Sequence, residues 1–247
     1  MRSRNYNLSA TLYDALHADE VEKLARSLVP CLFASGVPES VTALDLGCGT
    51  GTLLGELQRY GIRGIGVDLS SEMVDLARSK HPSLEFVASD MCSLDLDREF
   101  DLVLCTNDAI NYLRPELRAA FFETAARHLT SRGMCYIDFD TETDITKCWD
   151  GQRSETAGAG WHLARIHTYD PERCLGTELQ KWSVEAVNGV RTFTESHILY
   201  PLSPGEITGL AHGAGLRVDH FIEPVEMRPL DKTLSSYLRL GCVIRWQ

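Results

Sequence analysis

The sequence predicts an α/β fold: a doubly wound, seven-stranded, mostly parallel sheet with a small inserted antiparallel β unit. Short apolar runs alternate with amphipathic helical segments through residues 41–140, which is typical of a parallel sheet covered by helices on both faces. After residue 140 the pattern changes to long alternating segments, which favour antiparallel strands. Two further apolar segments near residue 247 complete the seven predicted strands.

An amphipathic helix is predicted at the start of the chain. Residues 9–29 repeat leucine at helical spacing, with charged residues between. Pro30 interrupts this pattern, because proline lacks the backbone donor that a helix needs. We therefore expect residues 1–40 to form an N-terminal helical cap.

The α/β core is expected from residues 41–140 and 201–247. Ser70 or Ser71 can cap one helix, and Pro115 suits the first turn of another, with Gly133 past its end. The predicted core strands are residues 41–46, 64–67, 84–88, 100–105, 134–139, 216–222 and 237–246.

The inserted unit is expected from residues 141–200. Its first part, residues 141–160, is polar and contains glycines, which favours a loop or lid. Asn188-Gly189 is a strong hairpin signal between two alternating segments. The three predicted strands are residues 161–169, 175–187 and 190–200.

Composition narrows the class of partner. The net charge of −11 disfavours a surface that neutralises nucleic-acid phosphates. The sequence shows neither the apolar core of a signal peptide nor a membrane-spanning run. Its eight cysteines form no C-x-x-C pair, which disfavours a zinc or redox site and favours a reducing compartment. We expect a cytoplasmic protein, a monomer or homo-oligomer, that acts on a small molecule without nucleic-acid or membrane partners.

The glycine-rich run at residues 43–51 predicts a cofactor site, because it follows a strand and opens a helix. A carboxylate at Asp45 would repel a pyrophosphate on the helix N-terminus and attract a cationic amine or sulfonium. A dinucleotide fingerprint also needs glycine or alanine three residues after its second glycine, where Thr52 stands here. Both features disfavour a nicotinamide-dependent oxidoreductase. Asp68, at the end of the next strand, can accept hydrogen bonds from a ribose whether or not the cofactor is a dinucleotide, so it does not decide between the two.

This run resembles the first motif of the class I S-adenosylmethionine-dependent methyltransferases, and the likeness continues in order and spacing through most of the first 140 residues. It implies a Rossmann-like methyltransferase fold, with S-adenosylmethionine as the methyl donor and S-adenosylhomocysteine as the product. The cofactor-binding residues implied by the resemblance are Asp45, Gly47, Cys48, Gly49, Gly51, Asp68, Leu69, Met73, Ser89, Asp90, Met91 and Asn107.

The resemblance also implies separate roles within this set. Asp45 orients the turn and the cofactor's amino group, Asp68 takes the ribose, and Asp90 binds the adenine amino group. Asn107 is expected near the sulfonium. Met73 is equally well interpreted as a core residue.

Substrates of open α/β sheets bind beyond the carboxyl ends of the strands, and the N-terminal tyrosines can fold over the cofactor. Glu195 and His197 share a strand face, where they could form a base and its orienter or simply a solvated surface. Tyr13 has a core residue of the helix as its alternative. The candidate catalytic residues are His197, Asn107 and Tyr13, and the candidate substrate-binding residues are Tyr6, Asn111, Tyr112, His167, Tyr169, Glu195 and His197.

The two-part plan resembles methyltransferases of amino sugars and other natural products. The many acidic and aromatic residues near the expected mouth of the site favour a polar amine, of a sugar or another natural product, as the methyl acceptor. Transfer from a sulfonium is an in-line displacement, and it requires no metal because the leaving group is already activated. A small-molecule O-methyltransferase and a non-catalytic S-adenosylmethionine-binding module remain alternatives. A nucleic-acid methyltransferase is disfavoured, since residues 106–109 lack the Asn/Asp-Pro-Pro-aromatic signature of amino-group methylation.

Overall fold

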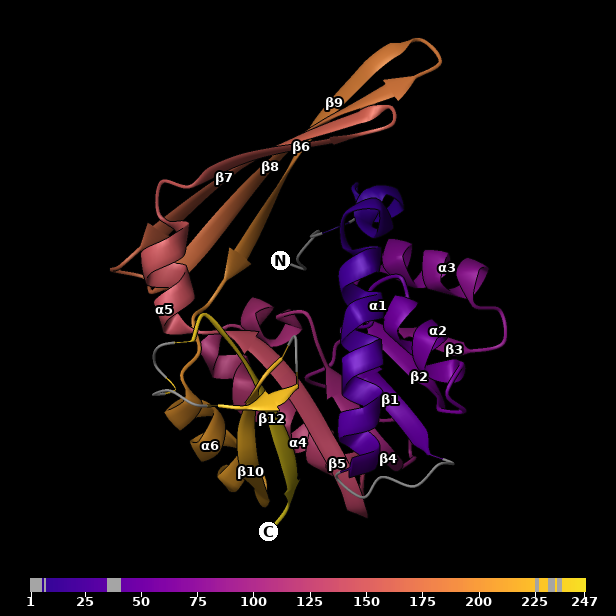
Figure 1. Cartoon of the computed structure of the whole chain (residues 1–247), viewed down its shortest axis with the longest axis vertical. Helices are drawn as coiled ribbons and strands as arrows, with labels where there is room; N and C mark the ends of the chain where they lie inside the picture. Colours follow the sequence, from indigo (N-terminus) through magenta and orange to yellow (C-terminus); the bar gives the residue numbers. More distant parts are fainter. Residues whose placement is uncertain (1–5, 7, 35–40, 225–226, 231–233, 235–236) are drawn as a thin grey trace.

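The structure, a computed structural model, describes residues 6, 8–34, 41–224, 227–230, 234 and 237–247. Two sheets organise these residues. A central, mostly parallel sheet carries helices on both faces, and an antiparallel sheet projects from one end of it (Figure 1). Among the described residues, no helix is both long and apolar enough to cross a membrane.

The central sheet contains the seven strands that the sequence predicts, and a two-residue strand at its edge makes eight. Its strands are β1 (Thr42–Leu46), β2 (Arg63–Asp68), β3 (Glu85–Ala88), β4 (Phe100–Cys105), β5 (Leu129–Asp140), β10 (Leu216–Glu223), β11 (Arg228–Pro229) and β12 (Arg239–Trp246). The spatial order is β11-β10-β12-β5-β4-β1-β2-β3. Strands β1 to β5 pair in parallel, and β12 runs antiparallel to both of its neighbours. The predicted α/β class is confirmed.

Two apolar clusters fix the helices to the sheet. One lies between the sheet and α1 (Ala10–Ala34), α2 (Thr52–Gln58) and α3 (Ser71–Lys80). The other joins the opposite face to α4 (Pro115–Arg127) and α6 (Pro204–Gly213) (Figure 1). Leu44 belongs to one cluster and Ala43 to the other, as the two-residue period of a strand requires.

The prediction that Pro30 ends the first helix is wrong, because α1 continues to Ala34. Proline removes one helical hydrogen bond. Here Leu28, Val29 and Leu32 are buried in the apolar cluster around that point. Their burial offsets the missing bond, a tertiary effect that the local pattern does not carry.

Gly133 was expected just outside a helix, but it lies within β5, which begins at Leu129. The pairing of β4 with β5 shifts register after Phe100, so the first residues of β5 form an irregular start to the strand. The indole nitrogen of Trp246 donates to the carbonyl oxygens of Leu129 and Thr130 at 3.2 and 3.0 Å. This contact with the last strand fixes the irregular segment as sheet.

The antiparallel sheet has four strands rather than the three predicted. They are β6 (Arg153–Gly158), β7 (Trp161–Asp170), β8 (Leu175–Ala186) and β9 (Gly189–Leu199), in that order. The predicted loop at 141–160 also contains α5 (Glu142–Asp144) and a π-helical turn, η2 (Ile145–Trp149). All six residues of β6 are exposed, so the sequence contains no apolar alternation that would predict this strand. The hairpin expected at Asn188-Gly189 is confirmed.

Arg118 of α4 holds the point where the antiparallel sheet returns to the core. Its buried guanidinium lies 2.6 Å from a carboxylate oxygen of Glu206. It also donates to the carbonyl oxygens of Tyr200 and Pro201, at 3.0 and 3.2 Å. One side chain thus joins α4, α6 and the segment after β9.

We predict that Arg118→Met lowers the free energy of unfolding by about 3 kcal/mol, because two carbonyl oxygens and a carboxylate lose a charged donor. Urea unfolding measures this change. Arg114→Met, at an exposed position before the same helix, is the control and should change stability by less than about 0.5 kcal/mol. Equal stability of the two variants would contradict the role of Arg118.

Candidate functional site

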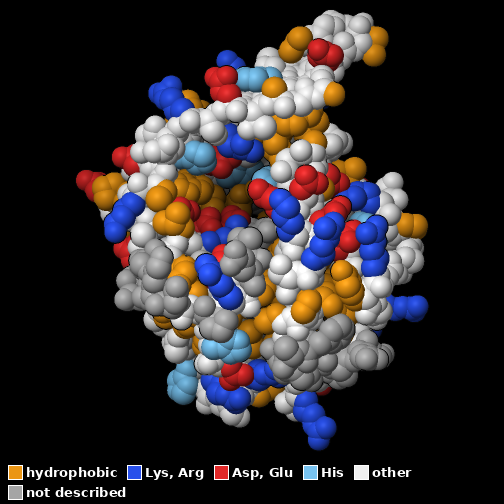
Figure 2. Space-filling view, in the orientation of Figure 1, with side chains coloured by type: hydrophobic (Ala, Val, Ile, Leu, Met, Phe, Trp, Pro, Cys, Tyr) orange, Lys and Arg blue, Asp and Glu red, His pale blue; other side chains and the backbone are white. Residues whose placement is uncertain are grey.

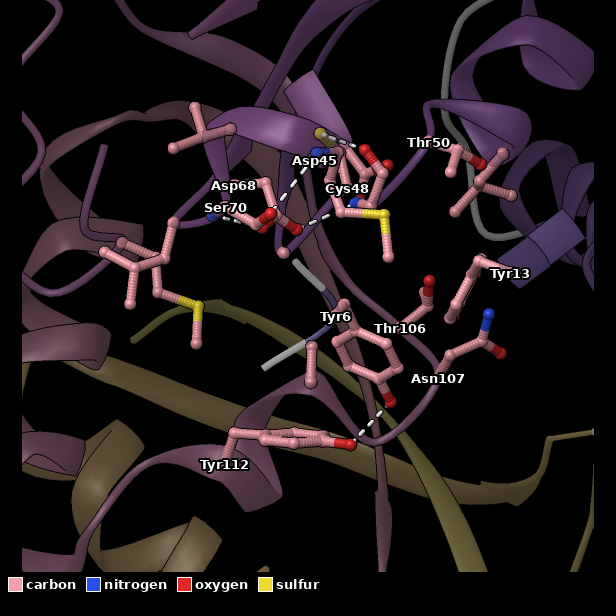
Figure 3. Close-up of a pocket in the computed structure, with 18 of the residues that line it drawn as sticks. Tyr6, Tyr13, Asp45, Cys48, Thr50, Asp68, Ser70, Thr106, Asn107 and Tyr112 are labelled. Atoms are coloured by element: carbon pink, nitrogen blue, oxygen red, sulfur yellow. Dashed lines mark hydrogen bonds between the residues drawn. The ribbon is translucent and has the colours of Figure 1, made fainter. Parts of the chain in front are cut away.

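A cavity lies at the carboxyl ends of β1, β2 and β4, beneath the first turns of α1. It contains about 1180 Å³ of empty space, its open mouth included. Figure 2 shows the molecule hollowed between the antiparallel sheet and the α/β core. Figure 3 shows the lining side chains, which come from α1, the glycine-rich turn and the segments after β2, β3 and β4.

The glycine-rich turn exposes backbone to the cavity. Gly47, Gly49 and Gly51 all have positive φ, of 82°, 52° and 75°. A Cβ at Gly47 would lie 2.7 Å from Ala109, and one at Gly51 would lie 2.6 Å from the ring of Phe86. A Cβ at Gly49 would meet nothing nearer than 3.9 Å. The outer two glycines are needed for packing as well as for φ, and Gly49 keeps the cavity open to a ligand.

Asp45 lies on the cavity wall with 1% of its surface exposed. Its Oδ2 atom has no hydrogen-bond partner. Burial, and then the charges of Asp68 and Asp138, raise the pKa of Asp45 to about 7. A buried carboxylate with a free oxygen is costly alone and is stabilised by a cation. This observation fits the ammonium group of S-adenosylmethionine.

Asp68 joins the glycine-rich turn to the start of α3. One carboxylate oxygen accepts a hydrogen bond from the amide of Gly49 at 2.9 Å, and the other accepts from Ser70 at 2.8 Å. Burial raises the pKa of Asp68, and these backbone donors oppose the shift. Asp68 lines the cavity and has further lone pairs, which suits it to ribose hydroxyls.

Four more predicted residues form the wall on the β3 side of Asp68. Leu69 is 48% exposed on the cavity rim, where an apolar side chain suits a flat aromatic ligand. Ser89, Asp90 and Met91 line the cavity after β3, and Asp90 accepts a hydrogen bond from the amide of Cys92 at 2.8 Å. Met73 is buried and also lines the cavity, so it is both a core residue and a candidate contact of the cofactor.

We call the opposite end the acceptor end, and it is lined by Tyr6, Tyr13, Thr106, Asn107, Ala109 and Tyr112 (Figure 3). The hydroxyl oxygens of Tyr6 and Tyr112 lie 2.5 Å apart. The rings of Tyr6 and Tyr13 meet edge to face at 5.3 Å. Asn107 and the next residue both have left-handed backbones, with φ of 53° and 51°. Such strain concentrates where side chains must be aimed.

The phenols of the acceptor end stay protonated at neutral pH. Burial is the largest cause that raises the pKa of Tyr6, Tyr13 and Tyr112 far above the usual value of a tyrosine. These hydroxyls can orient a ligand by hydrogen bonding, but they cannot serve as proton acceptors in place of a base.

His197 of β9 does not line the cavity. It is 1% exposed, so the interpretation as a solvated strand face is wrong. Its ring packs 4.4 Å from the ring of Tyr6, and its Nδ1 lies 3.4 Å from the hydroxyl of Tyr112. Burial lowers the pKa of His197, which keeps the imidazole neutral. Its Nε2 has no hydrogen-bond partner. The histidine therefore supports the acceptor end from behind the two tyrosines.

Asn111 is also separated from the cavity. Its side-chain amide donates to the carbonyl oxygens of Asp140 and Tyr200 at 2.9 and 3.1 Å, and its Oδ1 accepts from the amide of Asp140 at 3.0 Å. These bonds use the amide to join β5 to the end of β9.

His167 and Tyr169 lie on β7, in the antiparallel sheet, and do not line the cavity. His167 lies 3.0 Å from Glu178, which also binds Arg165 at 3.3 Å and Gln180 at 2.6 Å. Burial alone would raise the pKa of Glu178, but these partners lower it to about 2.

Sequence reasoning missed two groups around the site. Arg239 of β12 binds Asp138 and lies 3.4 Å from Asp108. Asp14 of α1 accepts from Thr50 of the glycine-rich turn at 2.5 Å and also pairs with Lys80. Each pair joins residues 30 or more positions apart, so no local spacing could have found them.

The sequence is similar to known methyltransferases. Residues 43–133 match the family model described as a methyltransferase domain. The chain is 27% identical over 219 residues to the dTDP-4-amino-2,3,4,6-tetradeoxy-D-glucose N,N-dimethyltransferase of Saccharopolyspora spinosa, covering 85% of this chain and 86% of that protein. It is also 27% identical over 220 residues to the dTDP-3-amino-3,4,6-trideoxy-alpha-D-glucopyranose N,N-dimethyltransferase of Streptomyces venezuelae, covering 85% and 91%.

The fold is shared with solved structures. An S-adenosylmethionine-dependent methyltransferase from Clostridium acetobutylicum superimposes with a TM-score of 0.84 at 20% identity, over 98% of each chain. This likeness covers both the central sheet and the antiparallel sheet.

We predict that S-adenosylmethionine binds about tenfold more weakly at pH 6 than at pH 8, because Asp45 must lose its proton to pair with the ligand's ammonium group. Titration calorimetry at both pH values measures the two dissociation constants. Asp45→Asn should bind weakly and with little pH dependence. Asp75→Asn, at an exposed position on α3, is the control and should keep the wild-type profile. An unchanged slope in Asp45→Asn would assign the titration to another group.

Proposed function

We propose that this chain, which is an S-adenosylmethionine-dependent methyltransferase, transfers the methyl group to the amine nitrogen of an amino sugar. The relatives from Saccharopolyspora and Streptomyces are named for this chemistry and match 85% of the chain. That span includes both the cofactor half and most of the rest of the chain, so the likeness is not limited to a shared cofactor motif.

The cavity supports this assignment on its cofactor side. Asp45 would hold the ammonium group of the cofactor, Asp68 would hold its ribose hydroxyls, and Leu69 and Met91 would pack on its adenine. All four side chains line the cavity. The cofactor supplies a methyl group already activated by its sulfonium. This leaves the acceptor end, around Asn107, as the place where the nucleophile is held.

One observation favours an amine over a hydroxyl as the nucleophile. Among the described residues that line the acceptor end there are tyrosines, a threonine and an asparagine, but no carboxylate and no imidazole. The raised pKa values of Tyr6 and Tyr112 prevent those phenols from acting as bases. A sugar hydroxyl would need such a base, whereas an amine gives its proton to water before it enters.

The protein's contribution to the transfer is then one of alignment. The hydroxyl groups of Tyr6 and Tyr112 and the amide of Asn107 orient the neutral amine so that its lone pair faces the methyl carbon on the side opposite sulfur. The carbon–nitrogen bond forms as the carbon–sulfur bond breaks, and the product ammonium releases its extra proton to water. Holding two reactants in line and away from water supplies much of the rate.

We further propose that residues 141–200 form the unit that holds the rest of the acceptor. Strands β7 and β8 carry charged and polar side chains that are largely shielded from water, among them Arg165, Glu178 and Gln180. In the shared orientation of Figures 1 and 2, the antiparallel sheet lies over the hollow. A polar overhang suits the hydroxyl groups and the charged remainder of a sugar derivative better than an apolar acceptor.

The decisive experiment compares matched acceptors. A nucleotide-linked aminodeoxy sugar and the same compound with hydroxyl in place of the amine are each incubated with the protein and radiolabelled methyl donor. We predict transfer to the amine, and a kcat/KM lower by roughly a thousandfold for the hydroxyl, which finds no base. The rate should rise with pH until the amine is neutral.

Two outcomes would contradict the proposal. Transfer to the hydroxyl analogue but not to the amine would indicate an O-methyltransferase. Tight binding of the methyl donor, with no transfer to any member of the acceptor panel, would favour the non-catalytic binding module.

A further inference from the structure

Leu8 and Ser9, just before α1, are held by a carboxylate from the distant antiparallel sheet, and we call Tyr6, Leu8 and Ser9 the N-terminal segment. Glu195 of β9 accepts hydrogen bonds from the backbone amides of Leu8 and Ser9 at 2.8 and 3.3 Å. These partners are 187 and 186 positions apart in the sequence. Glu195 is only 6% exposed. A buried carboxylate on backbone donors is a specific contact, and it is unlike the ion pairs of an exposed surface.

The contact supplies what α1 itself lacks. The first backbone amides of a helix have no partner within the helix, and a negative charge stabilises that end. The first turn of α1 contains no acidic residue. Ser9, just before the helix, has a buried hydroxyl without a hydrogen-bond partner. Glu195 therefore brings a negative charge to the start of α1, and it couples the two residues just before the helix to β9.

Tyr6, two positions before Leu8, depends on this placement. It adopts a left-handed backbone with φ of 62°, which is unfavourable for a residue with a Cβ. Its ring packs on His197 and its hydroxyl reaches Tyr112. Strained conformations persist only where neighbouring contacts impose them. Here the contacts come from β9 and from the segment after β4.

A second attachment lies on the other side of the cavity. Asp14 accepts hydrogen bonds from Thr50 and Thr52 at 2.5 and 3.2 Å and pairs with Lys80 of α3. The start of α1 is thus fixed to β9 before the helix and to the glycine-rich turn one turn into it. Tyr6 and Tyr13, near these two attachments, both line the cavity (Figure 3).

The attachment to β9 has the features of a contact that can open. Three polar atoms buried in it have no hydrogen-bond partner: Ser9 Oγ, Glu195 Oε2 and His197 Nε2. Unsatisfied buried polar groups make a closed contact less stable than an apolar one. The attachment through Asp14 has no such atoms among its described members.

We propose that Glu195 is a positioning residue that holds the N-terminal segment closed, so that Tyr6 completes the acceptor end of the cavity. The segment opens when the hydrogen bonds to Glu195 break. It closes over the bound cofactor when the amides of Leu8 and Ser9 donate to Glu195 again. The effect on transfer rests on the proposed function, whereas the closure itself does not.

The first test uses no acceptor. Glu195→Ala, Glu195→Gln and a matched control at an exposed position of β8, Glu185→Ala, are compared with the unchanged protein. We expect Glu195→Ala to speed hydrogen exchange at the Leu8 and Ser9 amides at least tenfold and to raise the dissociation rate of S-adenosylhomocysteine several-fold. Glu195→Gln keeps an acceptor oxygen and should stay within threefold of the unchanged protein. Glu185→Ala should show the same exchange and dissociation rates as the unchanged protein. Wild-type exchange and dissociation in Glu195→Ala would overturn the proposal.

The second test asks whether Glu195 acts through Tyr6. With an amine acceptor that reacts, Glu195→Ala should lower kcat at least tenfold, and adding it to Tyr6→Ala should lower kcat no further. Independent, multiplicative losses would overturn the coupling. If no amine reacts but the exchange and dissociation results hold, the proposed acceptor is wrong and the positioning role of Glu195 stands.

Discussion

The structure depends on one buried carboxyl group at the centre of the sheet. Asp45 lies on β1, between β2 and β4, where its backbone is paired on both sides. Its side chain is almost fully shielded from water, and its Oδ2 atom accepts no hydrogen bond from the neighbouring strands. The fold accepts a raised pKa and an unpaired oxygen at this position. Local frustration of this kind is relieved when a cationic ligand arrives, so the cost in the free protein becomes affinity in the complex.

The cofactor half was predictable because its signals are local. The strand, the glycine-rich turn and the helix α2 follow one another within residues 42–58, and Asp68 ends the next strand. Each element needs only its own residues and its neighbours to take shape. Gly47, Gly49 and Gly51 also announce positive φ, which few other residues adopt at low cost. Within residues 42–68, sequence and structure agree because backbone conformation decides the outcome there.

The other half of the site depends on contacts between distant segments, and the sequence carried little sign of them. Alternation correctly placed Glu195 and His197 on one face of β9, but not whether that face meets water. The answer came from Tyr6 and Leu8, which lie almost two hundred positions earlier and cover it. Arg239 was missed for the same reason, since Asp138 is 101 positions away. Strand β6 was missed because its exposed residues carry no apolar period.

The contacts of Tyr6 and Tyr112 with His197 also shield this histidine from methylation by the bound methyl donor. A neutral imidazole and a thiolate are nucleophiles that an activated methyl group would alkylate. His197 is neutral, but Tyr6 and Tyr112 stand between it and the cavity. Cys48 does line the cavity, yet burial and the nearby charges of Asp68 and Asp45 raise its pKa well above the usual range, so it remains a thiol. The protonated phenols at the acceptor end are equally unreactive. In the proposed reaction, an incoming amine is therefore the strongest nucleophile that meets the methyl group at this end of the cavity.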